Sequence, residues 1–174
     1  MTPEFSRPER LDTIGDRERR VTIEASDAER AALAKRFDLI AIDRLTADLT
    51  FRREAAGIVV RGRVAADVVQ ACVVTEAPVP ATIDEPVALR FVAQTGSAPD
   101  EIELSEDDCD TVPIEGSAID LGEAAAETMA LALDPFPRAP DAEAALREAG
   151  VLSEEEARPT GALAGLKEAL ERGR

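Results

Sequence analysis

The sequence predicts one α+β domain, in which an antiparallel sheet of three or more strands is covered by two helices and followed by a flexible C-terminal tail. Apolar and polar residues alternate repeatedly between residues 19 and 93, which is typical of half-buried strands. Helix-start signals occur at Ser26 and Asp120. The length of 174 residues suits a single core. We therefore expect the domain over residues 1–140 and an acidic, weakly helical tail over residues 141–174.

The first predicted strand covers residues 19–25, where apolar and polar residues alternate. Ser26 then opens the pattern Ser-Asp-Ala-Glu, a capping box in which the serine hydroxyl accepts a hydrogen bond from the backbone N–H of Glu29. A helix of about ten residues, ending near Phe37, should follow. Its apolar side chains are mostly alanine, so it can pack close to a sheet but buries little area.

Two longer alternating segments predict a hairpin around the four-residue loop 54–57. If Arg53 faces Ile58, apolar residues oppose apolar residues on one face and unlike charges oppose each other on the other face. A slip of one residue would lose both matches. This register opposes Phe51 with Val60, Asp48 with Arg63, and Arg44 with Asp67.

Two hairpin arginines, Arg52 and Arg61, have no acidic partner in this register. They lie on neighbouring strands of the exposed face, and an unpaired pair of arginines can contact phosphate. RNA contact through Arg52 and Arg61 is therefore one functional hypothesis. The alternative is that both are ordinary solvated arginines, because two charges are a small footprint for nucleic acid.

Residues 79–93 form a third alternating segment. Pro80 and Pro86 each lack a backbone donor, which predicts an edge strand or a bulged one. Further along, Asp120 and Glu123 form the signature of a second capping box, and the helix that they open should cover the sheet. The prolines that follow residue 134 should end it.

The formal net charge of −16 is unevenly distributed. Residues 1–63 hold 13 basic and 12 acidic residues, whereas residues 64–174 hold 7 basic and 24 acidic ones. The densest run is DEIELSEDDCD, so we expect a solvated excursion over residues 95–117. It is either a solubilising loop or a docking surface for a basic partner. The candidate docking residues are the acids of this run, namely Asp100, Glu101, Glu103, Glu106, Asp107, Asp108 and Asp110.

The composition argues against most enzyme mechanisms. The chain has no histidine, which excludes imidazole general-base catalysis and every metal site that needs imidazole. It contains none of the glycine-rich phosphate-binding motifs and no nucleophile-elbow motif. We therefore expect no catalytic residues, no cofactor and no metal. An enzyme that uses paired carboxylates is a third hypothesis, weaker than binding to a protein or to RNA.

The remaining composition predicts a reduced, soluble, cytoplasmic protein. Two cysteines do not make a disulfide scaffold, and Cys72, on the apolar side of its strand, is expected to be a buried and inert thiol. No apolar segment approaches the roughly 20 residues that a membrane span needs. The N-terminal residues also lack the apolar core of a signal peptide.

Five motifs occur in an order that resembles one protein family. They are FSR-x-x-x-LD at Phe5–Asp12, A-S-x-x-E-R-x-x-L-A-x-R-F at Ala25–Phe37, Q-A-C-V-V-T-x-x-P-V at Gln70–Val79, I-D-L-x-E at Ile119–Glu123, and L-A-L-D-P-F-P-R-A-P at Leu131–Pro140. The chain resembles the YceD family, also called the large ribosomal RNA subunit accumulation proteins. Many members carry C-x-x-C where this chain has Cys72-Val73-Val74-Thr75, and the missing second cysteine argues against a zinc site.

The resemblance implies a bacterial cytoplasmic protein that supports 23S rRNA accumulation through large-subunit assembly, and it implies no known catalytic residues. The charge suggests how such a protein could work. A strongly acidic chain is repelled by naked RNA, so we expect docking on a basic ribosomal protein, another assembly factor or an assembly intermediate through the acidic surface of residues 100–127. Direct rRNA binding through Arg52 and Arg61 is the alternative.

Overall fold

A computed structural model describes residues 3–93, 110–114 and 116–152. In chain order its strands and α-helices are β1 (Pro8–Arg10), β2 (Arg19–Glu24), α1 (Asp27–Arg36), β3 (Ala41–Glu54), β4 (Gly57–Ala71), β5 (Pro78–Ala93), β6 (Asp110–Ile114), β7 (Ala118–Asp120), α2 (Leu121–Leu131) and α3 (Ala142–Glu148). One short 3₁₀ helix, Leu11–Thr13, follows β1. The predicted α+β class is confirmed.

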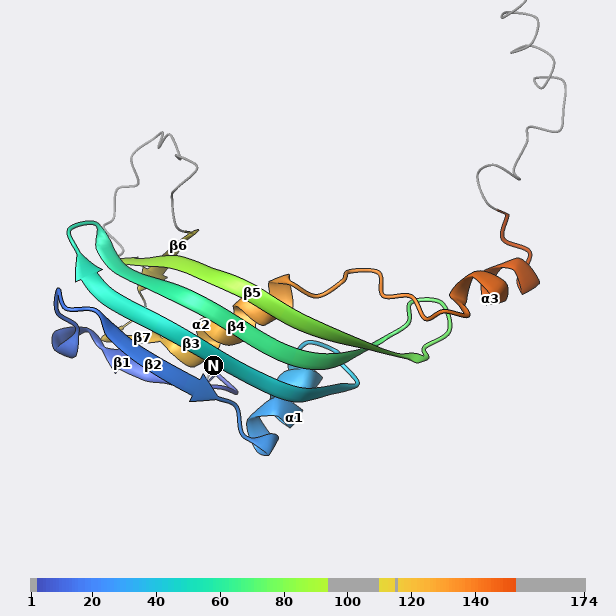
Figure 1. Cartoon of the computed structure of the whole chain (residues 1–174), viewed down its shortest axis with the longest axis horizontal. Helices are drawn as coiled ribbons and strands as arrows, with labels where there is room; N and C mark the ends of the chain where they lie inside the picture. The colour runs from blue at the N-terminus through green and yellow to red at the C-terminus, as the bar shows by residue number, and fades with distance from the viewer. Residues whose placement is uncertain (1–2, 94–109, 115, 153–174) are drawn as a thin grey trace, which may run out of the picture.

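The main sheet has five strands in the order β2-β3-β4-β5-β6, and β1 pairs separately with β7 (Figure 1). The predicted antiparallel pairing is confirmed for β2 to β5. It is wrong for β6, which runs parallel to β5 over Leu89–Ala93. Parallel neighbours need a longer connection than a hairpin turn, and residues 94–109 provide the length for one.

The predicted register of the β3–β4 hairpin is confirmed. Phe51 lies opposite Val60, and the numbers of opposed residues sum to 111 from the Arg44 pair to the turn. The turn is tighter than the predicted four-residue loop, because Glu54 and Gly57 still oppose each other. A register shift beyond Arg44 is the only irregularity in this ladder.

The predicted start of α1 is confirmed in full. Ser26 accepts from the N–H of Glu29 at 3.4 Å, and the Glu29 carboxylate accepts from the N–H of Ser26 at 2.7 Å. The start of α2 is confirmed in part. Asp120 caps the helix by accepting from the N–H of Gly122 and of Glu123, but the Glu123 carboxylate bonds Arg36 instead of completing the box.

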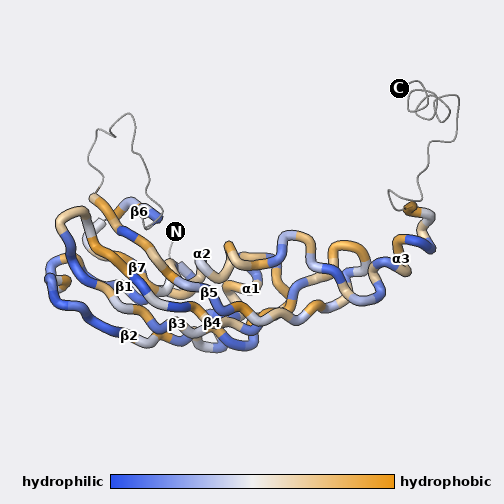
Figure 2. The backbone as a smooth tube through the Cα atoms, turned by 45° about the horizontal axis from the view of Figure 1, so that its top comes forward, coloured by the Kyte–Doolittle hydropathy of each residue, from blue (hydrophilic) through white to orange (hydrophobic). Residues whose placement is uncertain are grey.

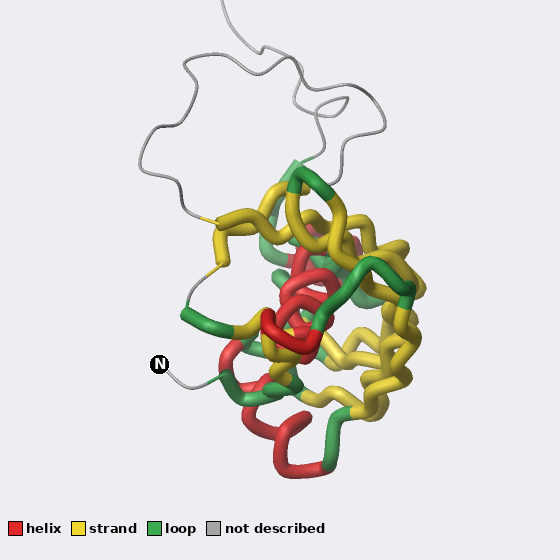
Figure 3. The backbone as a smooth tube through the Cα atoms, turned by 90° about the vertical axis from the view of Figure 1, so that its left-hand side faces the viewer, coloured by secondary structure: helices red, strands yellow, loops and turns green. Residues whose placement is uncertain are grey.

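Both covering helices lie on one face of the main sheet, as an end-on view shows (Figure 3). Apolar residues of the strands and of α2 form the buried core between them. The largest fully buried side chains there include Phe5, Leu33, Phe51, Ile119 and Met129. Figure 2 shows hydrophobic and hydrophilic residues alternating along the strands. The opposite face of the sheet, here called the outer face, carries polar and charged side chains from β2 to β5.

Two glycines allow close approaches that shape this core. A Cβ at Gly62, whose φ is +156°, would collide with the carbonyl oxygen of Asp48 on the neighbouring strand, so glycine lets β3 and β4 curve together. A Cβ at Gly122 would collide with the carbonyl oxygen of Phe5. The first turn of α2 therefore packs directly on the N-terminal segment.

The C-terminal predictions have a mixed outcome. The first weakly helical piece of the predicted tail is confirmed as α3, and Gly150 follows its end. Residues 153–174 lie outside the described residues. Within the predicted solvated excursion, the prediction is wrong for residues 110–114, which form β6. Among the described residues, no helix has the length and apolar character needed to cross a bilayer.

Candidate functional site

A groove lies between α2 and the strands β5 and β6. It consists of two hollows of about 450 and 290 Å³, and Leu89 lines both of them. The floor is apolar because inward-facing strand residues meet the small residues of α2. Apolar lining residues are Val87, Leu89, Phe91, Val112, Ile114, Ala124, Leu131 and Ala132.

Among the described residues, carboxylates are the charged groups that line this groove. Five acidic residues line it, and no lysine or arginine does, within the part of the chain that the structure describes. They come from β5, the start of β6, the cap of α2 and two successive turns of α2. These acidic residues are Glu85, Asp110, Asp120, Glu123 and Glu127. We call this feature the acid-lined groove.

Two of the five carboxylates hold the wall of the groove in place. The Asp120 carboxylate accepts from the Ser6 hydroxyl at 2.5 Å and from the backbone N–H of Arg7 at 2.8 Å. Glu123 pairs with Arg36 of α1 at 2.6 Å, and this bond is the main cause that raises the pKa of the Arg36 guanidinium. These contacts fix α2 against α1 and the N-terminal segment.

The other three carboxylates are available to a ligand. Glu85, Asp110 and Glu127 are exposed side chains, and none forms an ion pair with a described residue. They are spread along both sides of an apolar floor. The arrangement can accept hydrogen bonds from ammonium or guanidinium groups while the floor contacts the aliphatic stems of the same side chains.

Sequence reasoning named only one of these three residues individually. Asp110 belongs to the predicted acidic docking residues, and the structure places it at the start of β6. The other six, Asp100, Glu101, Glu103, Glu106, Asp107 and Asp108, lie outside the described residues. Glu127 lies within the predicted acidic surface of residues 100–127 but was not named as a docking residue, and Glu85 was missed. One signal was available for each: Glu85 occupies a position of the apolar alternation in its strand, and Glu127 follows Glu123 by one helical turn.

The predicted RNA-contacting arginines lie on the outer face, away from the groove. Arg52 pairs with Glu54 at 2.7 Å, so the prediction that Arg52 has no acidic partner is wrong. The sequence argument considered only residues across the hairpin, whereas Glu54 lies two positions along the same strand and on the same face. Arg61 is also engaged in an interaction. The premise of two free cations therefore fails.

Three other arginines of the outer face also form ion pairs. Arg44 pairs with Asp67 at 2.8 Å, as predicted. Arg63 pairs with Asp84 of β5 at 2.8 Å instead of the predicted Asp48. Asp48 is bound from the other side by two β2 residues, through the Thr22 hydroxyl at 2.5 Å and an ion pair to Arg20 at 3.7 Å. A third strand on each side of the hairpin thus changes its pairing.

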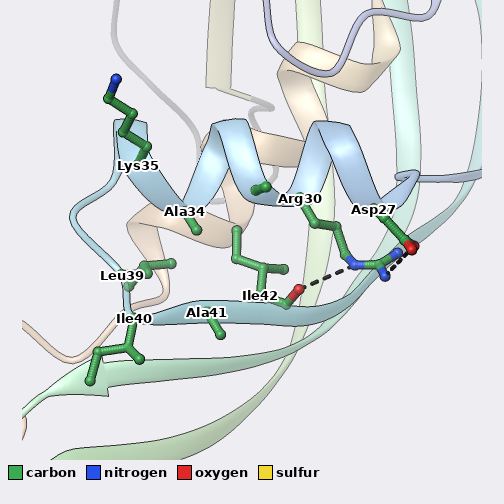
Figure 4. Close-up of a pocket in the computed structure, with 9 residues that line it drawn as sticks. Asp27, Arg30, Ala34, Lys35, Leu39, Ile40, Ala41 and Ile42 are labelled. Carbon is green, nitrogen blue, oxygen red and sulfur yellow. Dashed lines mark hydrogen bonds and ion pairs between the residues drawn. The ribbon is translucent and has the colours of Figure 1, made fainter.

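A different hollow lies between α1 and the start of β3 (Figure 4). It has a volume of about 430 Å³ and includes Arg30 in its lining. The Arg30 guanidinium donates to the carbonyl oxygens of Ala25 and Ile42 and to the Asp27 carboxylate, as the dashed lines to the last two show. The Arg30 charge is therefore used structurally, and the Lys35 side chain, which also belongs to this lining, points away from Leu39 and Ile42 (Figure 4).

Two of the sequence motifs meet at one end of the sheet. The Gln70 side-chain amide donates to the Asp134 carbonyl oxygen at 2.8 Å, and the N–H of Val73 donates to the Pro137 carbonyl oxygen at 2.9 Å. The segment after α2 thereby covers Cys72, which is buried as predicted. Hydrogen bonds, chiefly from the backbone of Ala139, lower the pKa of the Cys72 thiol to about 7.

These features describe a small α+β protein with an acidic, apolar-floored groove on the helical side of a curved sheet. The sequence model of the YceD family, described as large ribosomal RNA subunit accumulation protein YceD, matches residues 60–168, which is more than half of the chain. The chain therefore belongs to the YceD family, and the resemblance seen in its motifs is confirmed. No curated protein and no solved structure matches it.

Proposed function

We infer that this protein is a non-enzymatic factor in biogenesis of the large ribosomal subunit, where it supports accumulation of the subunit's rRNA by holding a basic protein segment in the acid-lined groove. Membership of the YceD family supports the biological process. The observation that carries the mode of binding is the groove itself, whose lining holds five carboxylates and no cation among the described residues.

The charge of the groove favours a protein ligand over RNA. Carboxylates that line a hollow with an apolar floor focus a negative potential, which attracts cationic side chains and repels phosphate. The partner that fits is a lysine- or arginine-rich segment of a ribosomal protein or of another assembly factor, met in the bacterial cytoplasm. Such segments are abundant in proteins that themselves bind rRNA, because they must neutralise phosphates.

The proposed division of roles follows from the geometry. Glu85, Asp110 and Glu127 accept hydrogen bonds from the partner's cationic groups, and Leu89 and Phe91 contact its apolar atoms. Glu123 stays paired with Arg36 and keeps the α2 wall in place. No covalent step is required, because shielding or delivering a basic segment needs only reversible binding.

The test is co-sedimentation of the full chain with large-subunit precursors, before and after ribonuclease treatment. The groove variant Glu85→Gln/Asp110→Asn/Glu127→Gln should lose at least about tenfold in association, because each partner cation would lose its acceptor. A matched control, Asp16→Asn/Glu143→Gln/Glu148→Gln, removes the same three charges from exposed positions outside the groove. It should bind as the wild type does.

Each outcome has a defined meaning. Equal loss in both variants would mean that net charge and not the groove drives association, and unchanged binding of the groove variant would overturn the proposal. Substitution of the seven acids of 100–110 by Asn and Gln measures their share of the docking. Association that disappears after ribonuclease treatment, with protein crosslinks absent, would favour direct rRNA binding instead.

A further inference from the structure

The two long edges of the main sheet are protected very differently. Over residues 78–88, the edge of β5 that faces away from β4 has no neighbouring strand among the described residues. This stretch contains Pro78, Pro80 and Pro86. Proline at an edge removes donors and discourages pairing with another chain. The opposite edge, β2, contains no proline and no bulge over its six residues.

The backbone of β2 presents alternate residues to its open side. The N–H of Ala25 donates to the Leu45 carbonyl oxygen, which makes these two a hydrogen-bonded pair of the β2–β3 ladder. Such pairs alternate with non-bonded ones in antiparallel sheets, so Arg20, Thr22 and Glu24 direct their N–H and C=O groups away from β3. The Glu24 carbonyl oxygen indeed accepts from the Arg7 guanidinium at 3.0 Å, outside the ladder.

The same residues decide what can pair with this edge. Arg20, Thr22 and Glu24 are exposed, and β2 is the terminal strand of the main sheet in the described chain. Val21 and Ile23 face the core on the other side. An incoming strand must therefore offer polar, charge-complementary side chains on the outer face and apolar ones on the inner face.

We propose that β2 pairs with β2 of a second copy of this chain, in antiparallel orientation about a two-fold axis at Thr22. In this register Arg20 lies opposite Glu24 of the second copy, Thr22 opposite itself, and Val21 opposite Ile23. Unlike charges meet on the outer face and apolar residues meet on the inner face. The two main sheets then continue into one another.

The neighbouring registers are disfavoured by charge. The free backbone groups belong to even-numbered residues, so an even-numbered residue must lie opposite an even-numbered one. The register can therefore change only in steps of two residues, and each step moves the two-fold axis by one residue. Moving the axis to Arg20 opposes two arginines, and moving it to Glu24 opposes two glutamates. Moving it to Val21 opposes Glu24 with Glu18, and moving it to Ile23 leaves Arg20 opposite Ser26, without an acidic partner. The Glu24 carbonyl oxygen has two lone pairs, so it can accept from both Arg7 and the second copy.

Sedimentation velocity of the full chain over a concentration range up to about 100 µM tests the proposal. The wild type should dimerise, and Thr22→Pro should weaken dimerisation at least about tenfold, because the lost N–H points to the open edge and not to β3. Thr82→Pro on β5 is the matched control. Thr22 and Thr82 each donate a hydroxyl hydrogen bond to an aspartate of the adjacent strand, Asp48 and Asp67, so both variants lose the same kind of internal contact.

Charge-reversal variants test which residues of the two β2 strands lie opposite each other. Arg20→Glu and Glu24→Arg should each be monomeric alone, because like charges would face each other. A mixture of the two variants should form a heterodimer, and the double variant should dimerise as the wild type does. A monomeric wild type, a dimer indifferent to Thr22→Pro, or a mixture that stays monomeric would each overturn the proposal. Circular dichroism checks that every variant is folded.

Discussion

Several arginines of the outer face form ion pairs with neighbouring acids, whereas three carboxylates of the acid-lined groove form no ion pair with a described residue. Arg44, Arg52 and Arg63 of the outer face each form an ion pair at 2.7–2.8 Å. The groove keeps Glu85, Asp110 and Glu127 without one among the described residues. This contrast shows that the number of charges on a surface does not by itself indicate that the surface binds a charged ligand. What matters is whether those charges are already neutralised by neighbours.

The largest expected effect comes from the close approach of β3 and β4 at Gly62, in the sheet that carries both surfaces. Gly62→Ala should lower the free energy of unfolding by about 3 kcal/mol, because a Cβ there collides with the Asp48 carbonyl oxygen. Gly15→Ala is the control, since nothing lies within 4 Å of a Cβ at Gly15. Urea unfolding followed by circular dichroism measures both. Equal stability of the two variants would show that the close approach at Gly62 relaxes without cost.

The second prediction concerns the outer face, whose arginines become available to RNA phosphates when their acidic partners are removed. Asp48→Asn/Asp67→Asn/Asp84→Asn releases the arginines that these acids neutralise, and should raise affinity for a labelled RNA hairpin by about tenfold at low salt. Fluorescence anisotropy over a salt series measures it. The control that removes three acids at Asp16, Glu143 and Glu148 should gain much less. A similar gain in both would attribute the effect to net charge and not to pairing.

The third prediction concerns the segment that holds the groove wall. A hydrogen bond from the Arg7 guanidinium is the main cause that lowers the pKa of Glu29 to about 2, from an ordinary value of 4.5. A carboxyl with a depressed pKa in the folded state contributes stability that is fully present above pH 4.5 and is lost as the pH falls towards 2. Glu29→Gln should therefore be less stable than the wild type at pH 7 by about 1 kcal/mol.

Thermal unfolding from pH 7 to pH 2 provides the measurement. The difference between Glu29→Gln and the wild type should shrink through the window from pH 4.5 to 2, because the wild-type carboxyl also becomes neutral there. A difference that stays constant over this range would mean that the Arg7 pair does not depend on the charge of Glu29.

The smallest effect is expected for the two arginines that the sequence singled out. Arg52→Ala/Arg61→Ala should change association with large-subunit precursors by less than about twofold, because Arg52 is already paired and Arg61 is engaged. Crosslinking to RNA in the same preparations checks the alternative. Strong hairpin crosslinks that vanish in this variant would restore direct rRNA binding as the function.

Local patterns predicted most of the fold. The capping residues and the β3–β4 register depend on neighbours in sequence or on one hairpin, so the sequence contains enough information to place them. The partner of Arg63 could not be found in this way, because Asp84 reaches it from a third strand. The direction of β6 was equally inaccessible, since it is set after a connection of residues 94–109 and not by alternation within β6 itself.

The groove shows the same limit at the level of function. Its free acids are far apart in sequence, from Glu85 on a strand to Glu127 on a helix, and only the packing of α2 beside β5 brings them to one surface. The acidic run of 100–110 is conspicuous in sequence, yet among the described residues it contributes only Asp110. Density of charge in sequence was therefore an incomplete indicator of the surface.

The pairing of β1 with β7 constrains when the molecule can be completed during synthesis. Pro8 lies opposite Asp120, and Phe5 is buried near the first turn of α2, although these partners are more than 100 residues apart in the chain. A nascent chain exposes its N-terminal segment early, but the surface that buries it does not exist until α2 has been translated. Because this long loop must close, the core of the domain is completed late in synthesis. Phe5 of a nascent chain therefore stays exposed to solvent until α2 is available to bury it.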